Sequence, residues 1–259
     1  MRRPVIGVTE PSGFTQDCID TIEKFYEGNP IKLCHNNHKN LVHWLDQCDG
    51  VILAGGVDIH PMVYGASVLN NYNLSRFDLQ RDKRELQIIH HCFTKNIPVL
   101  GICRGHQMLG IYHGLSMIMD LSDSAICHNP QKQNINFTRD EPMHAITMSE
   151  DVQIEIPEWK EMFEHMNFTQ KRRLFVNSFH HQGIVFGKET GKVVRVLATA
   201  MYSEKDKLIE MMESLPDQPR WVSCQFHPEY DWEKNPTSRM ILEMFKQLLP
   251  KDEPKAEVA

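Results

Sequence analysis

Two kinds of hydrophobic pattern alternate along the first half of the chain. Short apolar runs typical of buried strands are separated by longer segments in which apolar residues recur at helical spacing. The predicted strands are residues 4–8, 30–34 and 50–54 and the run that ends at Cys103. The predicted helices are residues 18–26, 38–47, 78–95 and 104–112. Because strands that alternate with helices form parallel sheets covered on both faces, this pattern predicts an α/β fold with a mostly parallel central sheet.

The second half of the chain is richer in strand patterns and polar segments. Residues 145–148 and 193–200 predict strands. Residues 237–249 predict a closing helix, because their apolar positions follow the helical period. Residues 64–75 and 122–141 are polar and predict loops.

One domain, residues 1–250, is the expected organisation, followed by a tail. Residues 251–259 are charged and are predicted to be disordered. The length of 259 residues would also allow two domains, and the hydrophobic content of 41% is enough for a sizeable core.

Charge and cysteine content exclude several classes of function. The net charge is −6, with 28 basic and 34 acidic side chains and no basic stripe, so nucleic acid is not an expected partner. No apolar signal region follows Arg3 and no apolar run approaches about 18 residues, so neither secretion nor membrane insertion is expected. Seven cysteines without tight spacing favour a reducing, cytoplasmic location.

No metal site is predicted, because the cysteines form no paired C-x-x-C motif. The neighbouring histidines His35 and His38, and the pair His90 and His91, are interpreted as surface or helix-packing side chains.

Cys103 is the first candidate for chemistry. It ends an apolar strand, is flanked by Gly101 and Gly105, and precedes a helical pattern. This is the pattern of a nucleophile elbow, in which a sharp strand-to-helix turn exposes one side chain. The start of a helix favours a thiolate, which is the attacking form of cysteine. The alternative is a buried structural cysteine.

His227 and Glu229 are the candidate partners of this thiol. They follow an apolar strand and are separated by Pro228, which stops the strand. Residues i and i+2 of an extended chain point the same way, so the carboxylate can orient the imidazole while its other nitrogen faces the thiol. Alone, this motif would also fit a surface strand end.

Acyl transfer also needs donors for an oxyanion. The backbone amide of Arg104, directly after the candidate nucleophile, is one candidate. The second is Gly56, in a glycine pair that ends the strand 50–54. Glycine allows close approach of a ligand, although the pair also fits a simple turn.

Several motifs together resemble the gamma-glutamyl hydrolase family. This branch of the class I glutamine amidotransferase superfamily includes gamma-glutamyl-gamma-aminobutyrate hydrolases. The motifs span roughly residues 4 to 248 and are A-G-G-V-D-I-H-P-M-V-Y-G (54–65), R-D-K-R-E (81–85), G-I-C-R-G-H-Q (101–107), V-N-S-F-H-H-Q (176–182) and Q-F-H-P-E (225–229). The resemblance implies a single flavodoxin-like class I glutamine amidotransferase domain.

The resemblance also assigns roles to individual residues. It implies a triad of Cys103, His227 and Glu229, with Gly56 and Arg104 at the oxyanion positions. It further implies contacts to the amino and carboxylate groups of a glutamyl substrate, at Gln107, Asn177, Ser178, Phe179 and His180.

Two departures from the family pattern leave this triad untouched. Where the family often has a glycine pair after the nucleophile helix, this chain has His113 and Gly114. Where an Asp-Gly turn is common, residues 204–210 lack one, which leaves the geometry of that hairpin open.

The resemblance implies a cysteine-dependent hydrolase that cleaves a small gamma-glutamyl conjugate through a thioester, without metal or organic cofactor. The alternative is a glutaminase subunit that supplies ammonia to a separate synthetase, since such subunits use the same triad. A catalytically silent module with this fold is disfavoured by the complete triad. The leaving amine and a homodimeric state stay open.

Overall fold

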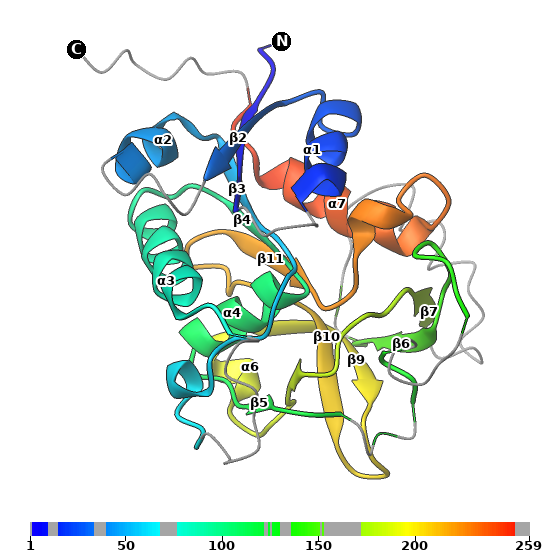
Figure 1. Ribbon diagram of the computed structural model, residues 1–259. Coiled ribbons are helices and arrows are strands. Elements are labelled where there is room, and N and C mark those ends of the chain that lie inside the picture. The colour runs from blue at the N-terminus through cyan, green and yellow to red at the C-terminus, as the bar shows by residue number, and fades with distance from the viewer. Residues whose placement is uncertain are drawn as a thin grey trace.

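A nine-stranded sheet organises the protein (Figure 1). The computed structural model describes residues 2–9, 15–33, 40–67, 77–121, 124, 126–129, 136–150, 152 and 172–251. The strand order is β2-β1-β3-β4-β11-β10-β9-β6-β7. The chain therefore builds one half of the sheet first, adds the other half, and returns to the centre with β11.

The first half of the sheet is parallel throughout. Its strands are β1 (Val5–Thr9), β2 (Asn29–Leu33), β3 (Gly50–Leu53), β4 (Val99–Ile102) and β11 (Trp221–Cys224). The carboxyl ends of these strands share one edge, which is where open α/β sheets bind ligands.

The second half of the sheet is antiparallel. Its strands are β10 (Lys207–Glu213), β9 (Arg195–Met201), β6 (His144–Met148) and β7 (Arg173–Val176). A separate two-stranded sheet pairs β5 (Met117–Ile118) with β8 (Gly183–Ile184). The predicted α/β fold with a parallel central sheet is confirmed, and antiparallel strands extend one side of it.

Helices cover both faces of the parallel half (Figure 1). One face carries α1 (Thr15–Lys24) and α7 (Pro236–Leu248), and the other carries α2 (Leu41–Gln47), α3 (Leu79–Thr94) and α4 (Arg104–Tyr112). Successive residues of β3 alternate between these layers, because Ile52 packs in the α1–α7 core whereas Val51 and Leu53 pack in the other. A short helix, α6 (Thr190–Val193), precedes β9.

The hairpin that the sequence left open is well formed without glycine. The N–H of Tyr202 donates to the carbonyl of Asp206 over 3.0 Å, and the hydroxyl of Ser203 donates to the Asp206 carboxylate over 2.8 Å. These polar contacts close the turn between β9 and β10, so residues 207–213 form a full strand.

Several sequence predictions lie outside the described residues. They concern His35 and His38, residues 68–75 of the predicted loop 64–75, much of the segment 122–135, and the tail from residue 252. His90 and His91 lie on α3, where they contact Tyr112 and Asp46, so their interpretation as surface or packing residues is confirmed.

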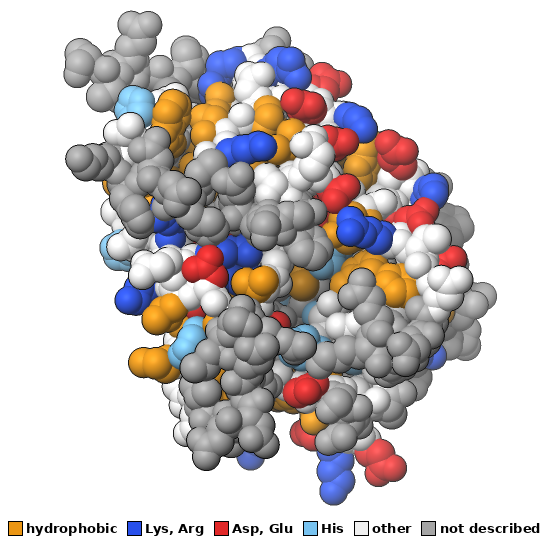
Figure 2. All heavy atoms as spheres, in the orientation of Figure 1, with side chains coloured by type: hydrophobic (Ala, Val, Ile, Leu, Met, Phe, Trp, Pro, Cys, Tyr) orange, Lys and Arg blue, Asp and Glu red, His pale blue; other side chains and the backbone are white. Residues whose placement is uncertain are grey.

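Charges of both signs lie on the described surface. On the described part of the face in Figure 2, basic and acidic side chains are intermixed over α1 and α7. None of the described helices is long and apolar enough to cross a membrane.

Candidate active site

Cys103 occupies a strained turn between β4 and α4. Its φ of 51° and ψ of −101° are rare for a residue with a side chain. A Cβ at Gly105 would overlap the backbone of Leu53, so only glycine lets α4 begin this close to β3. The side chain of Cys103 is 8% exposed, at the amino terminus of α4. The observed turn has the features of a nucleophile elbow.

His227 reaches the same edge from the neighbouring strand. The strand β11 pairs in parallel with β4, and the N–H of Cys103 donates to the carbonyl of Cys224 over 2.8 Å. The chain then turns into a short 3-10 helix, η5 (Pro228–Tyr230). Within this turn the Nδ1 atom of His227 lies 2.7 Å from Oε1 of Glu229, and both side chains are buried.

The protonated form of His227 is stabilised by its two neighbours. Burial alone would lower its pKa, but the charge of Glu229, the charge of Cys103 and hydrogen bonds to both outweigh burial and raise the pKa to about 10. The structure therefore favours an imidazolium beside the Cys103 sulfur, and an imidazolium stabilises a thiolate.

The glycine pair after β3 lies against both of these side chains. A Cβ built on Gly55 would lie 2.7 Å from Cε1 of His227 and 3.6 Å from Cβ of Cys103. Gly56 has a φ of 148°, which favours glycine. The backbone amides of Gly56 and of Arg104, the first residue of α4, belong to two segments that meet at Cys103. Their use as oxyanion donors stays a prediction.

A buried network of four charged side chains links α3 to the start of α4 and to the backbone that follows β3. The Arg104 guanidinium forms ion pairs with Asp82 and Glu85, both on α3. Arg81 donates to Glu85 over 2.8 Å and to the carbonyls of Ala54 and Gly55 over 3.0 and 2.9 Å. Burial raises the pKa of Glu85, but the two arginines outweigh this effect and lower it.

This network explains three positions of the R-D-K-R-E motif, which are Arg81, Asp82 and Glu85. Arg81 and Arg104 balance the charges of Asp82 and Glu85, so the buried group is neutral as a whole. The Arg104 side chain thus pairs with acidic groups close to the site. Because the Arg104 guanidinium is paired with α3, the backbone N–H is the part of Arg104 that stays a candidate for contact with a substrate.

Asn177 holds the backbone of His227. Its Nδ2 donates to the His227 carbonyl, and the His227 N–H donates to its Oδ1, both over 2.8 Å. Aromatic rings hold the imidazole: Tyr230 stacks on it with centroids 4.9 Å apart, and Phe179 meets it edge-on at 5.5 Å. The sequence predicted Asn177 and Phe179 as substrate contacts, and the structure places both directly against His227.

The remaining predicted substrate contacts are hydrogen-bonded to other parts of the chain. The side-chain amide of Gln107 donates to the Gln182 carbonyl over 3.0 Å and to Gln225 over 3.1 Å. The hydroxyl of Ser178 donates to the carbonyl of His128 over 2.6 Å. His180 donates from its backbone to the same carbonyl. Contact of these residues with a substrate stays a prediction.

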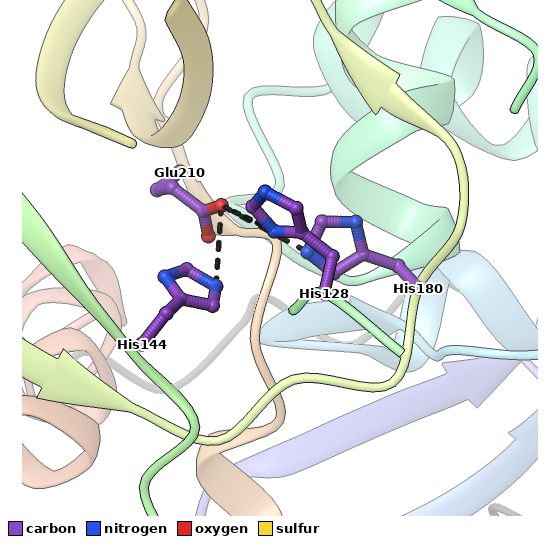
Figure 3. A group of neighbouring side chains, drawn as sticks. All are labelled: His128, His144, His180 and Glu210. Carbon is purple, nitrogen blue, oxygen red and sulfur yellow. Dashed lines mark ion pairs between the residues drawn. The ribbon is translucent and has the colours of Figure 1, made fainter. Parts of the chain in front are cut away.

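Three histidines and a glutamate that the sequence analysis did not connect lie together behind this segment. His128, His144, His180 and Glu210 are all buried, and their candidate ligand atoms lie within 4.8 Å of one another (Figure 3). Burial lowers the pKa of His128 to about 4 and that of His144 to about 3, and it raises the pKa of Glu210 to about 8.

Long sequence separation hid this cluster. The four residues belong to four separate segments of the chain, and only His180 belonged to a recognised motif. One feature points to the cluster. A histidine of β6 and a glutamate of β10 occupy buried strand positions. Such residues need partners that an apolar core does not supply.

Comparison with known proteins finds relatives that match most of the chain. The glutamine amidotransferase-like protein YvdE of Lactococcus lactis subsp. lactis is 32% identical over 211 residues, which cover 80% of this chain and 77% of YvdE. The gamma-glutamyl-gamma-aminobutyrate hydrolase PuuD of Escherichia coli K12 is 27% identical over 95% of this chain and 93% of PuuD. The crystal structure of a glutamine amidotransferase from Methylobacillus flagellatus aligns over the whole of both chains, with a TM-score of 0.59 and 12% identity.

The fold is therefore a mixed α/β fold that matches solved glutamine amidotransferase structures, with a strained cysteine turn at the edge of its sheet. The family model of Peptidase C26 matches residues 5–229. The chain belongs to the Peptidase C26 family.

Proposed function

We propose that this protein hydrolyses the gamma-glutamyl amide bond of a small conjugate and uses Cys103, His227 and Glu229 as a triad. One observation carries the proposal. A strained cysteine at a helix start lies against a buried histidine, whose pKa it raises together with a glutamate. Membership of the Peptidase C26 family and the similarity to PuuD support the same chemistry.

The first half of the reaction forms a thioester. The Cys103 thiolate attacks the gamma-carbonyl carbon, and the amides of Gly56 and Arg104 stabilise the negative oxygen of the tetrahedral intermediate. The His227 imidazolium gives its proton to the leaving nitrogen as the carbon–nitrogen bond breaks. The amine departs, and the glutamyl group stays on sulfur.

The second half releases glutamate. Neutral His227 takes a proton from water, whose oxygen attacks the thioester carbon. The carbon–sulfur bond breaks, and the sulfur leaves as a thiolate beside the imidazolium. Glu229 holds the ring through Nδ1 during both halves, so the other ring nitrogen faces the reacting atoms.

The glutamyl end of the substrate is read more strictly than the amine end in this proposal. Its charged amino acid head requires fixed polar partners, for which Gln107 and the segment 177–180 are the candidates. A site built around such a head rejects analogues that lack it by a factor on the order of 10⁴, since buried polar groups would be left unpaired.

A substrate panel tests the proposal. The purified chain alone is incubated with glutamine, gamma-glutamyl-aminobutyrate, a gamma-glutamyl polyamine and a short polyglutamate, and released glutamate is measured. We expect hydrolysis of at least one conjugate and none of the matched compounds that lack the alpha-amino group. Activity confined to glutamine, and seen only when a second protein is added, would instead establish the partner-dependent glutaminase.

A further inference from the structure

Four buried side chains from four separate segments converge behind the active-site edge (Figure 3). His128 lies in the segment 126–129, His144 begins β6, His180 follows β7, and Glu210 lies in the middle of β10. The Oε1 atom of Glu210 lies 3.9 Å from Nδ1 of His128, 3.6 Å from Nε2 of His144 and 3.8 Å from Nε2 of His180.

The facing atoms have no hydrogen-bond partners among the described residues. These atoms include Nε2 of His144, Nε2 of His180 and both carboxylate oxygens of Glu210. No lysine or arginine in the described part of the chain pairs with Glu210. Burial of polar atoms without hydrogen-bond partners costs free energy of folding. Four such side chains that face one another indicate that they share a partner.

The second nitrogens of two rings already have carbonyl neighbours. Nδ1 of His180 lies 2.8 Å from the carbonyl oxygen of Gln182, and Nδ1 of His144 lies 3.4 Å from that of Ala145. A carbonyl only accepts, so these contacts place the ring protons on Nδ1 and leave lone pairs on both Nε2 atoms. Metal-binding histidines are oriented in this way.

Protons alone do not satisfy the cluster. A protonated Glu210 carries one O–H group, which can donate to one imidazole nitrogen and leaves the lone pairs of the others unpaired. A single cation would accept lone pairs from all four side chains at once. Imidazole and carboxylate together suit Zn²⁺ and similar divalent transition metals.

We propose that His128, His144, His180 and Glu210 bind one Zn²⁺ ion. Tetrahedral bonds of about 2.0–2.1 Å bring neighbouring ligand atoms to about 3.3–3.4 Å, so the observed glutamate–histidine separations must close by about half an ångström. Four protein ligands complete a tetrahedral shell, which is the arrangement of structural zinc rather than of a metal that holds water. This assignment replaces the sequence expectation that the chain has no metal.

The ion would fix the segment that holds His227. His180 lies three residues after Asn177, which bonds to the His227 backbone, and directly after Phe179, which packs on the imidazole. Ser178 and His180 both bond to the carbonyl of His128, which is itself a proposed ligand. A metal bound here joins β6 and β10 to the segment 177–180. The zinc proposal does not depend on the proposed hydrolase activity.

Metal content is the first test. The full chain, without a histidine tag, is saturated with Zn²⁺ and freed of loose metal by gel filtration, and its zinc is then counted by mass spectrometry. We expect about one ion per chain. Glu210→Gln, which keeps the shape of the side chain, and His144→Ala should lose the ion. His43→Ala, which removes an exposed histidine of α2, should keep it.

Stability and spectroscopy complete the test. Removal of zinc from the wild-type protein should lower its midpoint of thermal unfolding by roughly 10 °C, and added Zn²⁺ should restore it. Reconstitution with Co²⁺ should give the visible absorption of a tetrahedral complex with nitrogen and oxygen ligands. This measurement uses only the wild-type protein, so it decides the question even if the ligand variants do not fold.

Three results would overturn the proposal. The wild-type protein could retain no zinc after gel filtration. Glu210→Gln and His144→Ala could retain as much zinc as His43→Ala. The Co²⁺ protein could show an octahedral spectrum, as expected for loose surface binding.

Discussion

The side chain of Asn177 grips the backbone of His227 at both its N–H and its carbonyl. Asn177 lies after β7, at the far edge of the sheet from β2, whereas His227 follows the central strand β11. The antiparallel half of the sheet is therefore attached directly to the histidine that faces the thiol.

Replacement of Asn177 should damage stability and turnover together. Asn177→Ala leaves two buried backbone groups of His227 unpaired, at about 1–3 kcal/mol each. We expect the free energy of unfolding in urea to fall by about 1–3 kcal/mol for each of the two groups. We also expect kcat to fall by a larger factor than KM rises. Asn177→Asp is the informative companion, because it keeps the acceptor for the N–H, loses the donor to the carbonyl and adds a buried charge. If both variants kept wild-type kcat, the two hydrogen bonds from Asn177 would not position His227.

Cys103 should be the single essential thiol. Cys103→Ala should abolish release of glutamate without unfolding the protein, and Cys103→Ser should bind substrate without turnover. An alkylating glutamine analogue should label Cys103 and not Cys92, because burial raises the pKa of the Cys92 thiol. Cys127→Ala serves as the matched control, since Cys127 is a more accessible cysteine. Label on another cysteine with activity intact in Cys103→Ala would refute the assignment.

His227 should make stability fall as pH rises. Its native pKa is raised to about 10, whereas an unfolded histidine has a pKa of about 6.5. Between these values the native state holds a proton that the unfolded state has lost, so this stabilisation is complete below about pH 6.5 and disappears through about pH 10. Urea unfolding at several pH values should show the decline.

The variant Glu229→Gln isolates this contribution. Without the carboxylate the pKa of His227 falls, so the difference in stability between wild type and variant should shrink as pH rises from 6.5 to 10. Groups that do not interact with Glu229 titrate alike in both proteins and cancel in the difference. A constant difference across this range would show that Glu229 does not hold a proton on His227.

Substitutions in the buried charge network should lower the free energy of unfolding more than substitutions in a surface ion pair. Arg104→Met removes the partner of both Asp82 and Glu85, and an unbalanced buried charge costs roughly 3–5 kcal/mol. Arg195→Met, whose pair with Glu213 is partly exposed, should cost less than about 1 kcal/mol. Chemical denaturation of the two variants gives the comparison. Equal losses would mean that the network contributes no more than a surface ion pair.

Local patterns were enough to predict the elbow and the parallel half of the sheet. The strand before Cys103, the helix after it and the strand before His227 each carry their own signal, since glycine, proline and the spacing of apolar residues act over a few residues. The pairing of β4 with β11 was not predicted; the sequence analysis expected only that His227 faces the Cys103 thiol.

The rest depends on contacts between distant residues. The sequence did not predict strands at residues 173–176 and 207–213, whose burial comes from neighbours across the sheet. Nor did it predict that Asn177 would bond to the backbone of His227, because an asparagine carries the same donors and acceptors for a backbone partner as for a ligand. The proposed zinc ligands are 82 positions apart at their extremes and share no local motif.

The position of β11 between β4 and β10 has a consequence for synthesis of the chain. The strand that carries Cys103 is made early, but its neighbour on that side lies more than a hundred residues later. Such a distant pairing forms slowly and only after the intervening chain exists. A growing polypeptide on the ribosome would therefore hold its cysteine without a base, and a fragment that stops before β11 should bear an inert thiol.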